Sequence, residues 1–465
     1  MEQQYTNKQK DFEERQYQKL SKLKELGRYK NYFIVLLALI LMVDIIDNIT
    51  TNANNAVTSS FIKEFFINGH LFGNDYDLAS GLALHNTISL IGHVIGLLTP
   101  FYKSLGDKYG RKPLFVLSTL GMTFGLLIVY FSKSYLTFMI GTFTMSFFLG
   151  HDIQIIYILE EAPAKHRATV YSIIKGIGGL STILLPIMRE SLMRNDDTLW
   201  RNIYILPGIA GLVICLLVLI FAKETNTYIN GRLEYLQIPY EERIKQEEQL
   251  KKEKKANGNK AGIFNAVSYI FKNKDLRTLI LIKSIFDAAI IAVTNYEPIM
   301  NEAGMSAASI TEALYYYPII YCVAVIISGF MADKIGRKKT ILIFGSITFV
   351  GFALFTLTTR NLADPKIIGL FYGLYLGGYW IGRDYMEIIS TEMVPTDIRA
   401  SIVGAEGLLV YVGMGIGLAV VNIGMIFIPI WLTCLVWILP CVGISLYFLS
   451  LKVKETKGID YESIK

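Results

Sequence analysis

Long apolar runs alternate with short polar segments along almost the whole chain. The hydrocarbon core of a bilayer is about 30 Å thick, and a helix crosses it with about 20 mostly apolar residues. Runs of this length cover residues 31–57, 81–102, 113–131, 135–158, 168–190, 202–222, 276–299, 309–332, 340–358, 366–391, 400–427 and 430–451. The pattern therefore predicts an all-α integral membrane protein with twelve transmembrane helices.

The composition agrees with this pattern. Of the 465 residues, 52% are hydrophobic and only 18% are charged. These charges are too few to cover a soluble protein of this size, so lipid must form part of the solvent. The cysteines all lie in apolar runs, where a small buried side chain is favoured over a disulfide or a metal site. We expect no metal and no cofactor.

Positive charges in the polar segments predict the orientation in the membrane. The first 30 residues are polar and highly charged, so we expect no cleavable signal peptide. Lysine and arginine are abundant in this tail and after spans 2, 6 and 8, whereas the segment after span 1 has only Lys63 and that after span 7 has none. The positive-inside rule then predicts a multi-pass plasma-membrane protein with both termini in the cytoplasm. The net charge of +6 follows from this bias and does not indicate a nucleic-acid partner.

The two halves of the chain repeat each other in three places. Asp107 and Asp333 stand in matching motifs 226 residues apart, and the segment Lys223–Thr225 returns as Lys454–Thr456. Six more positions match at a constant offset of 232 residues: Gly150, Asp152, Glu160, Pro163, Arg167 and Ala168 recur as Gly382, Asp384, Glu392, Pro395, Arg399 and Ala400. We therefore expect two pseudo-symmetric bundles of six helices each.

This repeat predicts the domain organisation. The expected parts are a cytoplasmic N-terminal tail (1–30), a first six-helix bundle (31–222), a cytoplasmic linker with helical content (223–275), a second six-helix bundle (276–452) and a cytoplasmic C-terminal tail (453–465). In the linker, the charged stretch from Pro239 to Lys255 favours a helix.

Charged residues inside the spans indicate which helices line a path. Spans 3, 6, 9 and 12 carry no charged residue or histidine in their apolar cores, whereas the other spans do. A charge at the centre of a bilayer costs about 2.5 to 3.5 kcal/mol on insertion scales. Such groups must face each other or a hydrated cavity between the bundles. The candidate substrate-binding residues are Asn48, His85, His151, Asp152, Lys175, Lys283, Asp287, Tyr375, Tyr379, Arg383, Glu387 and Glu406.

Helical spacing groups some of these candidates. Tyr375, Tyr379, Arg383 and Glu387 recur every four residues and so share one face of span 10. Lys283 and Asp287 are also four residues apart, and two roles remain open for them: an ion pair within their own helix, or contacts with a substrate.

Two carboxylates in the first span are the candidates for proton coupling. Asp44 and Asp47 lie three residues apart, and no basic residue on that span neutralises them. A low-dielectric cavity disfavours the charged form of a carboxylate, which allows it to carry a proton. The alternatives are that they bind the substrate or form structural ion pairs.

Short motifs in the polar loops resemble those of a known family. The segment Gly106–Lys112 (GDKYGRK) and its repeat Asp333–Lys339 (DKIGRKK) resemble the loop signature of the major facilitator superfamily. The run from Tyr157 to Arg167, the pair Trp200-Arg201 and the closing segment Lys454–Gly458 are similar to its sugar-porter and organic-ion branches. The resemblance covers the chain apart from the N-terminal tail.

That resemblance implies a latch at the cytoplasmic ends of the helices. It would consist of charge-assisted contacts between neighbouring helix ends that hold the outward-facing state and break when the inside opens. Its residues would be Asp107, Arg111, Glu160, Arg167, Asp333, Arg337, Glu392 and Arg399.

The function predicted from the sequence is secondary active transport by alternating access. We expect a small polar or anionic metabolite, moved by proton-coupled symport through a monomer in the lipid bilayer. Hexose carriers have a Gln-Gln pair where this chain has Phe286-Asp287, and the Gly-Pro signature of many drug/proton antiporters is not matched at Lys175–Gly179. The alternatives are a sugar or polyol uniporter or symporter, a drug or metabolite efflux antiporter, and a non-transporting sensor. No enzyme motif with a nucleophile or metal ligands occurs, so we expect no enzyme.

Overall fold

The computed structural model describes residues 2–96, 105–106, 108–149, 157–158, 160–161, 167–243, 245, 263–394 and 399–456. The described residues form helices and short turns, with no β-strand among them. In the first half the helices are α1 (Glu2–Leu26), α2 (Tyr32–Ala53), η1 (Asn54–Ala56), α3 (Thr58–Ile62), η2 (Lys63–Asn68), η3 (Leu71–Gly73), α4 (Leu78–Gly96), α6 (Arg111–Phe131), α7 (Tyr135–Leu149), α9 (Arg167–Leu180), η5 (Ser181–Ile183), α10 (Leu184–Ser191), η6 (Asp197–Leu199), α11 (Asn202–Phe221) and α12 (Asn226–Gln237). In the second half they are α14 (Ile263–Lys272), α15 (Lys274–Asp287), η7 (Ala288–Ile290), α16 (Ile291–Glu302), α17 (Ala307–Leu314), α18 (Tyr317–Ile335), α19 (Arg337–Arg360), α20 (Pro365–Glu392), α21 (Arg399–Gly424) and α22 (Ile430–Lys452).

Seven helical segments of the described chain are long and apolar enough to cross a membrane. They are Tyr32–Ala56, Arg111–Phe131, Asp197–Phe221, Ala307–Ala332, Arg337–Arg360, Ala405–Gly424 and Ile430–Lys452. Two of the predicted spans are not continuous α-helices. The 3₁₀ turn η5 interrupts span 5 (168–190), and the 3₁₀ turn η7 interrupts span 7 (276–299). Pro186 accounts for the first interruption, because proline has no N–H to donate to the carbonyl of Thr182 one turn earlier.

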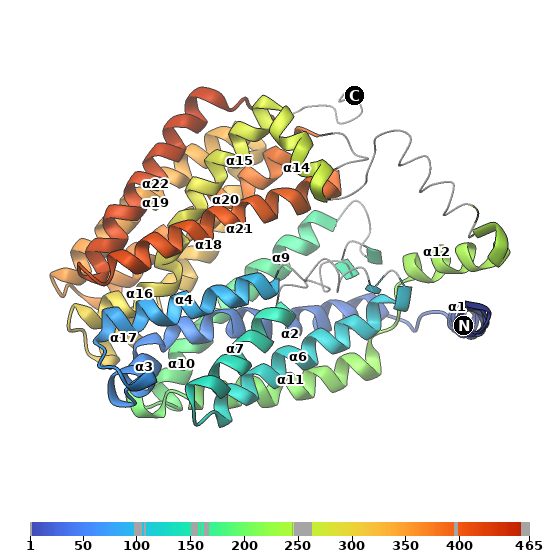
Figure 1. Ribbon diagram of the computed structural model, residues 1–465, viewed down its shortest axis with the longest axis horizontal. Coiled ribbons are helices and arrows are strands. Elements are labelled where there is room, and N and C mark those ends of the chain that lie inside the picture. The colour runs from blue at the N-terminus through green and yellow to red at the C-terminus, as the bar shows by residue number, and fades with distance from the viewer. Residues whose placement is uncertain are drawn as a thin grey trace.

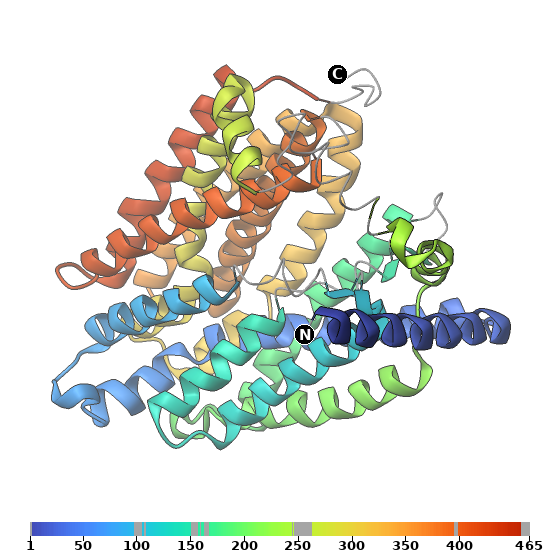
Figure 2. The same ribbon diagram turned by 45° about the vertical axis from the view of Figure 1, so that its right-hand side comes forward.

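The helices form two bundles that meet at one end of the molecule. Helices α2 to α11 make the first bundle and α15 to α22 the second (Figures 1 and 2). We call the end with α3, α10, α16 and α17 the outer end. There α16 contacts α3 and η1, and α10 contacts α17. The bundles diverge toward the opposite, inner end, where α1, α12 and α14 lie (Figure 1).

Exposed apolar stripes show that the helix surfaces require an apolar solvent. On α11, Leu206, Ile209, Val213, Leu216 and Ile220 are all exposed and recur every three or four residues, so they form one face. A contiguous apolar face of this length would be unfavourable in water and is typical of a helix that faces lipid.

Small residues let helices within a bundle approach closely. Gly121 and Gly125 of α6 are spaced as in GxxxG, and a Cβ on Gly125 would lie 3.0 Å from the carbonyl oxygen of Gly141 on α7. Backbones in such contact gain van der Waals packing, which drives helix association where the hydrophobic effect is absent.

The first-half loop motif forms a turn that ends in a capped helix. Gly110 has a φ of 106°, which favours glycine, and α6 begins at the next residue. The carboxylate of Glu224 accepts hydrogen bonds from the backbone N–H groups of Arg111, at 2.7 Å, and Lys112. It therefore satisfies groups that a helix N-terminus leaves unpaired. Burial raises the pKa of Glu224 above its usual value, although these backbone hydrogen bonds oppose the rise.

The second half repeats this arrangement. Gly336 has a φ of 99°, and the Glu455 carboxylate accepts from the backbone N–H groups of Arg337, at 2.8 Å, and Lys338. The repeated Lys-Glu-Thr segments of the sequence thus cap the first turns of α6 and α19. The internal repeat extends to the hydrogen bonds of the two loops.

Gly110→Ala is expected to destabilise the protein by about 1 to 3 kcal/mol. An alanine would have to adopt a φ that L-residues rarely take, and its Cβ would collide with the Glu224 carboxylate. Gly231→Ala is a matched control, because Gly231 lies within α12 and its Cβ would meet no atom within 4 Å. Thermal unfolding in detergent should show a lower Tm for Gly110→Ala and an unchanged or raised Tm for Gly231→Ala. Equal Tm values for the two variants would contradict this account of the turn.

The N-terminal helix packs against the linker at the inner end. Leu20 of α1 lies in a small apolar cluster with Tyr228, Ile229 and Leu233 of α12. Helix α12 ends at Gln237, before the stretch that the charge pattern favours. Of that stretch, residues 240–243 and 245 are helical, and residues 246–255 lie outside the described residues.

Candidate functional site

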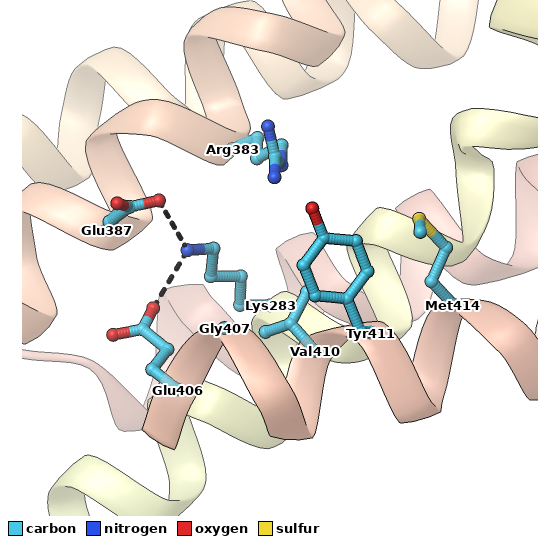
Figure 3. Close-up of a pocket in the computed structure, with 8 residues that line it drawn as sticks. All are labelled: Lys283, Arg383, Glu387, Glu406, Gly407, Val410, Tyr411 and Met414. Atoms are coloured by element: carbon cyan, nitrogen blue, oxygen red, sulfur yellow. Dashed lines mark hydrogen bonds and ion pairs between the residues drawn. The ribbon is translucent and has the colours of Figure 1, made fainter. Parts of the chain in front are cut away.

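Lys283 of α15 is the centre of a charged cluster in the second bundle. Its Nζ lies 3.0 Å from Oε2 of Glu387 on α20 and 2.8 Å from Oε1 of Glu406 on α21 (Figure 3). The side chains of Lys283 and Glu406 are only 3% and 2% exposed, whereas that of Glu387 is 44% exposed. The hydroxyl of Ser390 also donates to Glu406. One carboxylate is therefore held in place, and the other reaches solvent.

Arg383 and Asp287 form the second ion pair of this cluster, with 3.2 Å between Nε and Oδ2. The guanidinium also lies 5.1 Å from the ring centroid of Trp380, within cation–π range. An ion pair between Lys283 and Asp287 on their own helix was one of two possible roles, but both residues pair with α20 instead. On both α15 and α20 the basic residue precedes the acidic one by four positions. Because the two helices run antiparallel, each charge meets an opposite one across the helix interface.

These charges line a cavity with one apolar wall. The cavity lies against Lys283, Arg383 and Glu387. Residues of α21 complete it, and the hydroxyl of Tyr411 points toward Arg383 (Figure 3). The α21 residues that line it are Glu406, Gly407, Val410, Tyr411 and Met414. Charged groups and an apolar surface in one cavity suit a small amphiphilic molecule.

The two candidate tyrosines of α20 lie beside this cavity and do not line it. Tyr375 is fully buried, and its hydroxyl donates to the carbonyl oxygen of Ala289 at 2.6 Å, inside the interruption η7. Tyr379 is also fully buried and stacks on Phe286, with its hydroxyl 3.5 Å from Asp287. The two tyrosines therefore support α15 without contacting the cavity. Tyr375 does so by donating to a backbone carbonyl oxygen that the interruption leaves without a helical partner.

A separate ion pair lies in the first bundle. Lys175 Nζ of α9 donates to Oδ1 of Asp44 on α2 at 2.9 Å, and Asn48 donates to Oδ2 of the same carboxylate at 3.2 Å. Asp44 is completely buried, and the side chain of Lys175 is 31% exposed. Although α2 has no basic residue near Asp44, α9 supplies one. Gly178 makes this approach possible, because a Cβ there would collide with the Asp44 carboxylate.

The other first-bundle candidates are spread out. Asp47 is buried. The hydroxyl of Thr51, one helical turn later, lies 3.5 Å from Oδ1 of Asp47. His85 packs among aromatic rings, with Nδ1 3.0 Å from the Tyr135 hydroxyl, and does not join the ion pair of Asp44. His151 and Asp152 lie outside the described residues.

The latch residues whose side chains are described make contacts within one bundle. In the first bundle, Arg111 Nε and Nη2 donate to Oε1 of Glu160 at 3.0 and 2.9 Å. In the second, Arg337 Nε lies 3.5 Å from Oε1 of Glu392. These ion pairs join helix ends of the same bundle, and they are formed while the bundles diverge at the inner end. Asp107 and the side chains of Arg167, Asp333 and Arg399 lie outside the described part of the chain.

An ion pair at the outer end explains the Trp200-Arg201 motif. The Arg201 guanidinium and the Trp200 indole N–H both donate to the carboxylate of Glu64, at 2.6 to 2.8 Å. Burial tends to raise the pKa of Glu64, but the hydrogen bonds from Arg201 and Trp200 outweigh burial and hold the pKa below its usual value. All three residues belong to the first bundle, so this pair fastens its outer end.

Sequence reasoning missed several polar residues that the structure buries or places at the cavity. Ser390 and Tyr411 carry no charge, so a search for charges inside apolar spans does not find them. Arg189 and Glu297 are charged but stand at the last positions of predicted spans, where a charge normally reaches the interface. In the structure both are fully buried at the outer end.

Comparisons with known proteins identify the family. Residues 31–418 match the model of the Major Facilitator Superfamily. The chain is 24% identical to the class H tetracycline resistance protein of Pasteurella multocida, over 67% of this chain and 71% of that protein. It is 25% identical to the cis,cis-muconate transport protein of Acinetobacter baylyi, over 64% and 68%. A crystal structure of a D-xylose-proton symporter has the same fold, with a TM-score of 0.69, 16% identity and coverage of 92% and 100%.

The family model covers most of the chain, and the fold agrees with it. Both predictions made from the sequence, an all-α membrane protein of the twelve-helix fold and a transporter rather than an enzyme, are thereby confirmed. The chain belongs to the major facilitator superfamily of transporters.

Proposed function

We propose that the protein is a proton-coupled symporter of a small metabolite that carries a carboxylate or a similar anionic group. The observation that supports this most directly is the geometry around Lys283. Its buried ammonium already holds a carboxylate that reaches solvent, that of Glu387, at 3.0 Å. A substrate carboxylate can replace Glu387 without leaving Lys283 unpaired, which would be costly at this depth.

Other groups of the cavity suit the rest of such a substrate. Arg383 and the Tyr411 hydroxyl, which points toward Arg383, offer further hydrogen-bond donors to the cavity (Figure 3). Val410 and Met414 offer apolar surface to the hydrocarbon part of the molecule. The cis,cis-muconate transport protein, a relative in the same family, has by its name a substrate of this kind.

Asp44 is our proposed proton carrier. Its carboxylate is buried and is balanced by Lys175 from another helix. When α2 and α9 shift relative to each other, Asp44 loses this balance, and a proton can then take the place of the lysine charge. Asp47 is the second candidate because it is buried on the same helix.

Alternating access would move the two bundles, 31–222 and 276–452, against each other. We infer that the inner end is cytoplasmic, that both termini lie there, and that the protein works as a monomer in the plasma membrane. The ion pairs Arg111–Glu160 and Arg337–Glu392 would keep each bundle rigid during this motion. The remaining latch residues would make the contacts that close the inner end.

A neutral sugar or polyol is the second candidate substrate. Lys283 and Arg383 are both already paired with carboxylates. The cavity therefore also suits a hydroxyl-rich molecule, whose hydroxyl groups can accept hydrogen bonds from the basic side chains and donate to the carboxylates. The fold shared with a D-xylose-proton symporter is compatible with this alternative.

Uptake into proteoliposomes tests the proposal. Labelled small carboxylates and neutral polyols are offered to the purified protein, each with and without an inward proton gradient. We expect a carboxylate to accumulate above equilibrium only when the gradient is present. Accumulation of polyols but not of carboxylates supports the second candidate. Uptake that is the same with and without the gradient contradicts proton coupling.

A further inference from the structure

One residue in the α21 wall of the substrate cavity has no side chain. Val410, Tyr411 and Met414 of that wall follow Gly407 by three, four and seven residues, so the four positions share one face of the helix. A side chain at residue 407 would therefore point toward the cavity. A Cβ built on Gly407 would meet no atom of the described chain within 4 Å, so the space beside it is open.

The usual structural reasons for a glycine do not apply to Gly407. It lies inside α21 and is not one of the described glycines with a positive φ. Two other glycines of the same helix allow close packing. A Cβ on Gly413 would lie 2.9 Å from Ser284, and one on Gly417 would lie 3.0 Å from Ala288. Glycine inside a helix is less favourable than alanine, so Gly407 is better explained by the space that it leaves in the cavity.

The matching residue of the first half does carry a side chain. Arg167 and Arg399 begin α9 and α21 and recur at the offset of the internal repeat. Eight residues after them stand Lys175 and Gly407. The side chain of Lys175 points into its own bundle, where it reaches Asp44 at 2.9 Å. The equivalent position of the second half thus leaves open a space that a side chain fills in the first half.

Gly407 lies at the charged end of the cavity. Glu406, the residue before it, contacts the Lys283 ammonium at 2.8 Å. Tyr411 and Met414 stand about one and two helical turns further along α21 (Figure 3). A substrate carboxylate at Lys283 would extend its hydrocarbon part toward Met414. The open space beside Gly407 would then lie next to the first carbon atom after the carboxyl group.

We propose that Gly407 is a specificity-determining residue, which makes the cavity selective for carboxylates with a branch on the carbon atom next to the carboxyl group. This inference rests on the proposed function, because it requires a substrate carboxylate at Lys283. A methyl-sized branch fills the space beside Gly407, which adds van der Waals contacts and removes apolar surface from water. An unbranched chain leaves that space empty. A methyl group supplied by the protein would occupy the same space and exclude the branch.

Two isomeric carboxylates test this selectivity. Butanoate and 2-methylpropanoate have the same atoms and the same charge, and only the second is branched beside its carboxyl group. Calorimetry with the purified protein in nanodiscs measures the Kd of each. We expect the parent protein to bind 2-methylpropanoate more tightly. Gly407→Ala should weaken the binding of 2-methylpropanoate about tenfold or more and leave the Kd of butanoate near the parent value, so the preference reverses.

Gly415→Ala is the matched control. Gly415 lies in the same helix, and a Cβ there would also meet no atom of the described chain within 4 Å, but it is not one of the described residues that line the cavity. Both Kd values should therefore stay near those of the parent. Neither alanine variant should lower the Tm, because each replaces a glycine inside a helix. The double variant Lys283→Ala, Glu406→Gln should bind neither isomer, since both ligands require the ammonium group.

The possible results distinguish this inference from the proposed function. Failure of the parent protein to bind either isomer, or unchanged binding in the double variant, overturns both, because the carboxylate site itself is then missing. The inference alone is overturned if the parent prefers butanoate, or if Gly407→Ala changes the two Kd values equally or not at all. The same reversal in Gly415→Ala also overturns it, because a general change in α21 would then set the preference.

Discussion

Lys283→Ala is expected to reduce substrate transport by about a hundredfold or more. The change removes the ammonium group that would bind the substrate anion, and it leaves Glu406, which is only 2% exposed, without its counter-charge. Removing one partner of a buried ion pair costs about 3 to 5 kcal/mol, so the Tm should fall as well. Initial uptake rates and thermal unfolding of the same preparation measure both effects.

The double variant Lys283→Ala, Glu406→Gln separates binding from folding. It removes the unpaired carboxylate, so we expect the Tm to recover while transport stays low. Lys366→Ala, an exposed lysine at the start of the same α20, serves as the control and should change neither quantity. Transport that recovers together with the Tm would show that Lys283 is needed only for stability.

The positions of the charged residues could be predicted from the sequence, but their partners could not. A charge inside an apolar span is visible in the amino-acid pattern, and this reasoning found Asp44, Lys175, Lys283 and Asp287. Which charges meet depends on how far one helix slides and rotates against its neighbour. The spacing of Lys283 and Asp287 allowed a pair on one helix, yet the antiparallel arrangement of α15 and α20 gives two pairs between helices.

The repeated motifs indicate a shared local structure in the two halves, in addition to their resemblance to a family. The Lys-Glu-Thr segments were visible as repeats, but the sequence alone assigned them no role. In the structure Glu224 and Glu455 cap the helices that follow Gly110 and Gly336. A repeat in both halves is thus a signal for a shared local structure, even before its partner is known.

The interruptions of spans 5 and 7 were not predicted, because an apolar run has the same composition whether its helix is continuous or broken. Pro186 was a visible signal for the first break. The burial of Arg189 and Glu297 at the outer end could not be predicted from hydropathy either. Their burial arises only from contact between the bundles, which no local pattern records.

Asp44→Asn is expected to abolish proton-driven accumulation while leaving substrate exchange in place. Asparagine has nearly the same shape, so it still fits beneath Gly178 and still bonds to Lys175 or Asn48. It cannot bind and release a proton, however, so substrate should cross without one. A proton gradient would then no longer raise the internal substrate level, whereas exchange of labelled for unlabelled substrate across the same vesicles should continue.

Two further variants decide whether Asp44 alone has this role. Asp47→Asn tests the neighbouring carboxylate on α2, and whichever variant loses accumulation but keeps exchange identifies the proton carrier. Asp364→Asn changes a carboxylate that caps α20, outside the bundle interior, and should leave both activities near the parent level. If concentrative uptake and its proton dependence survive in both Asp44→Asn and Asp47→Asn, the coupling group is not on α2, and Glu387, the exchangeable partner of Lys283, becomes the next carboxylate to test.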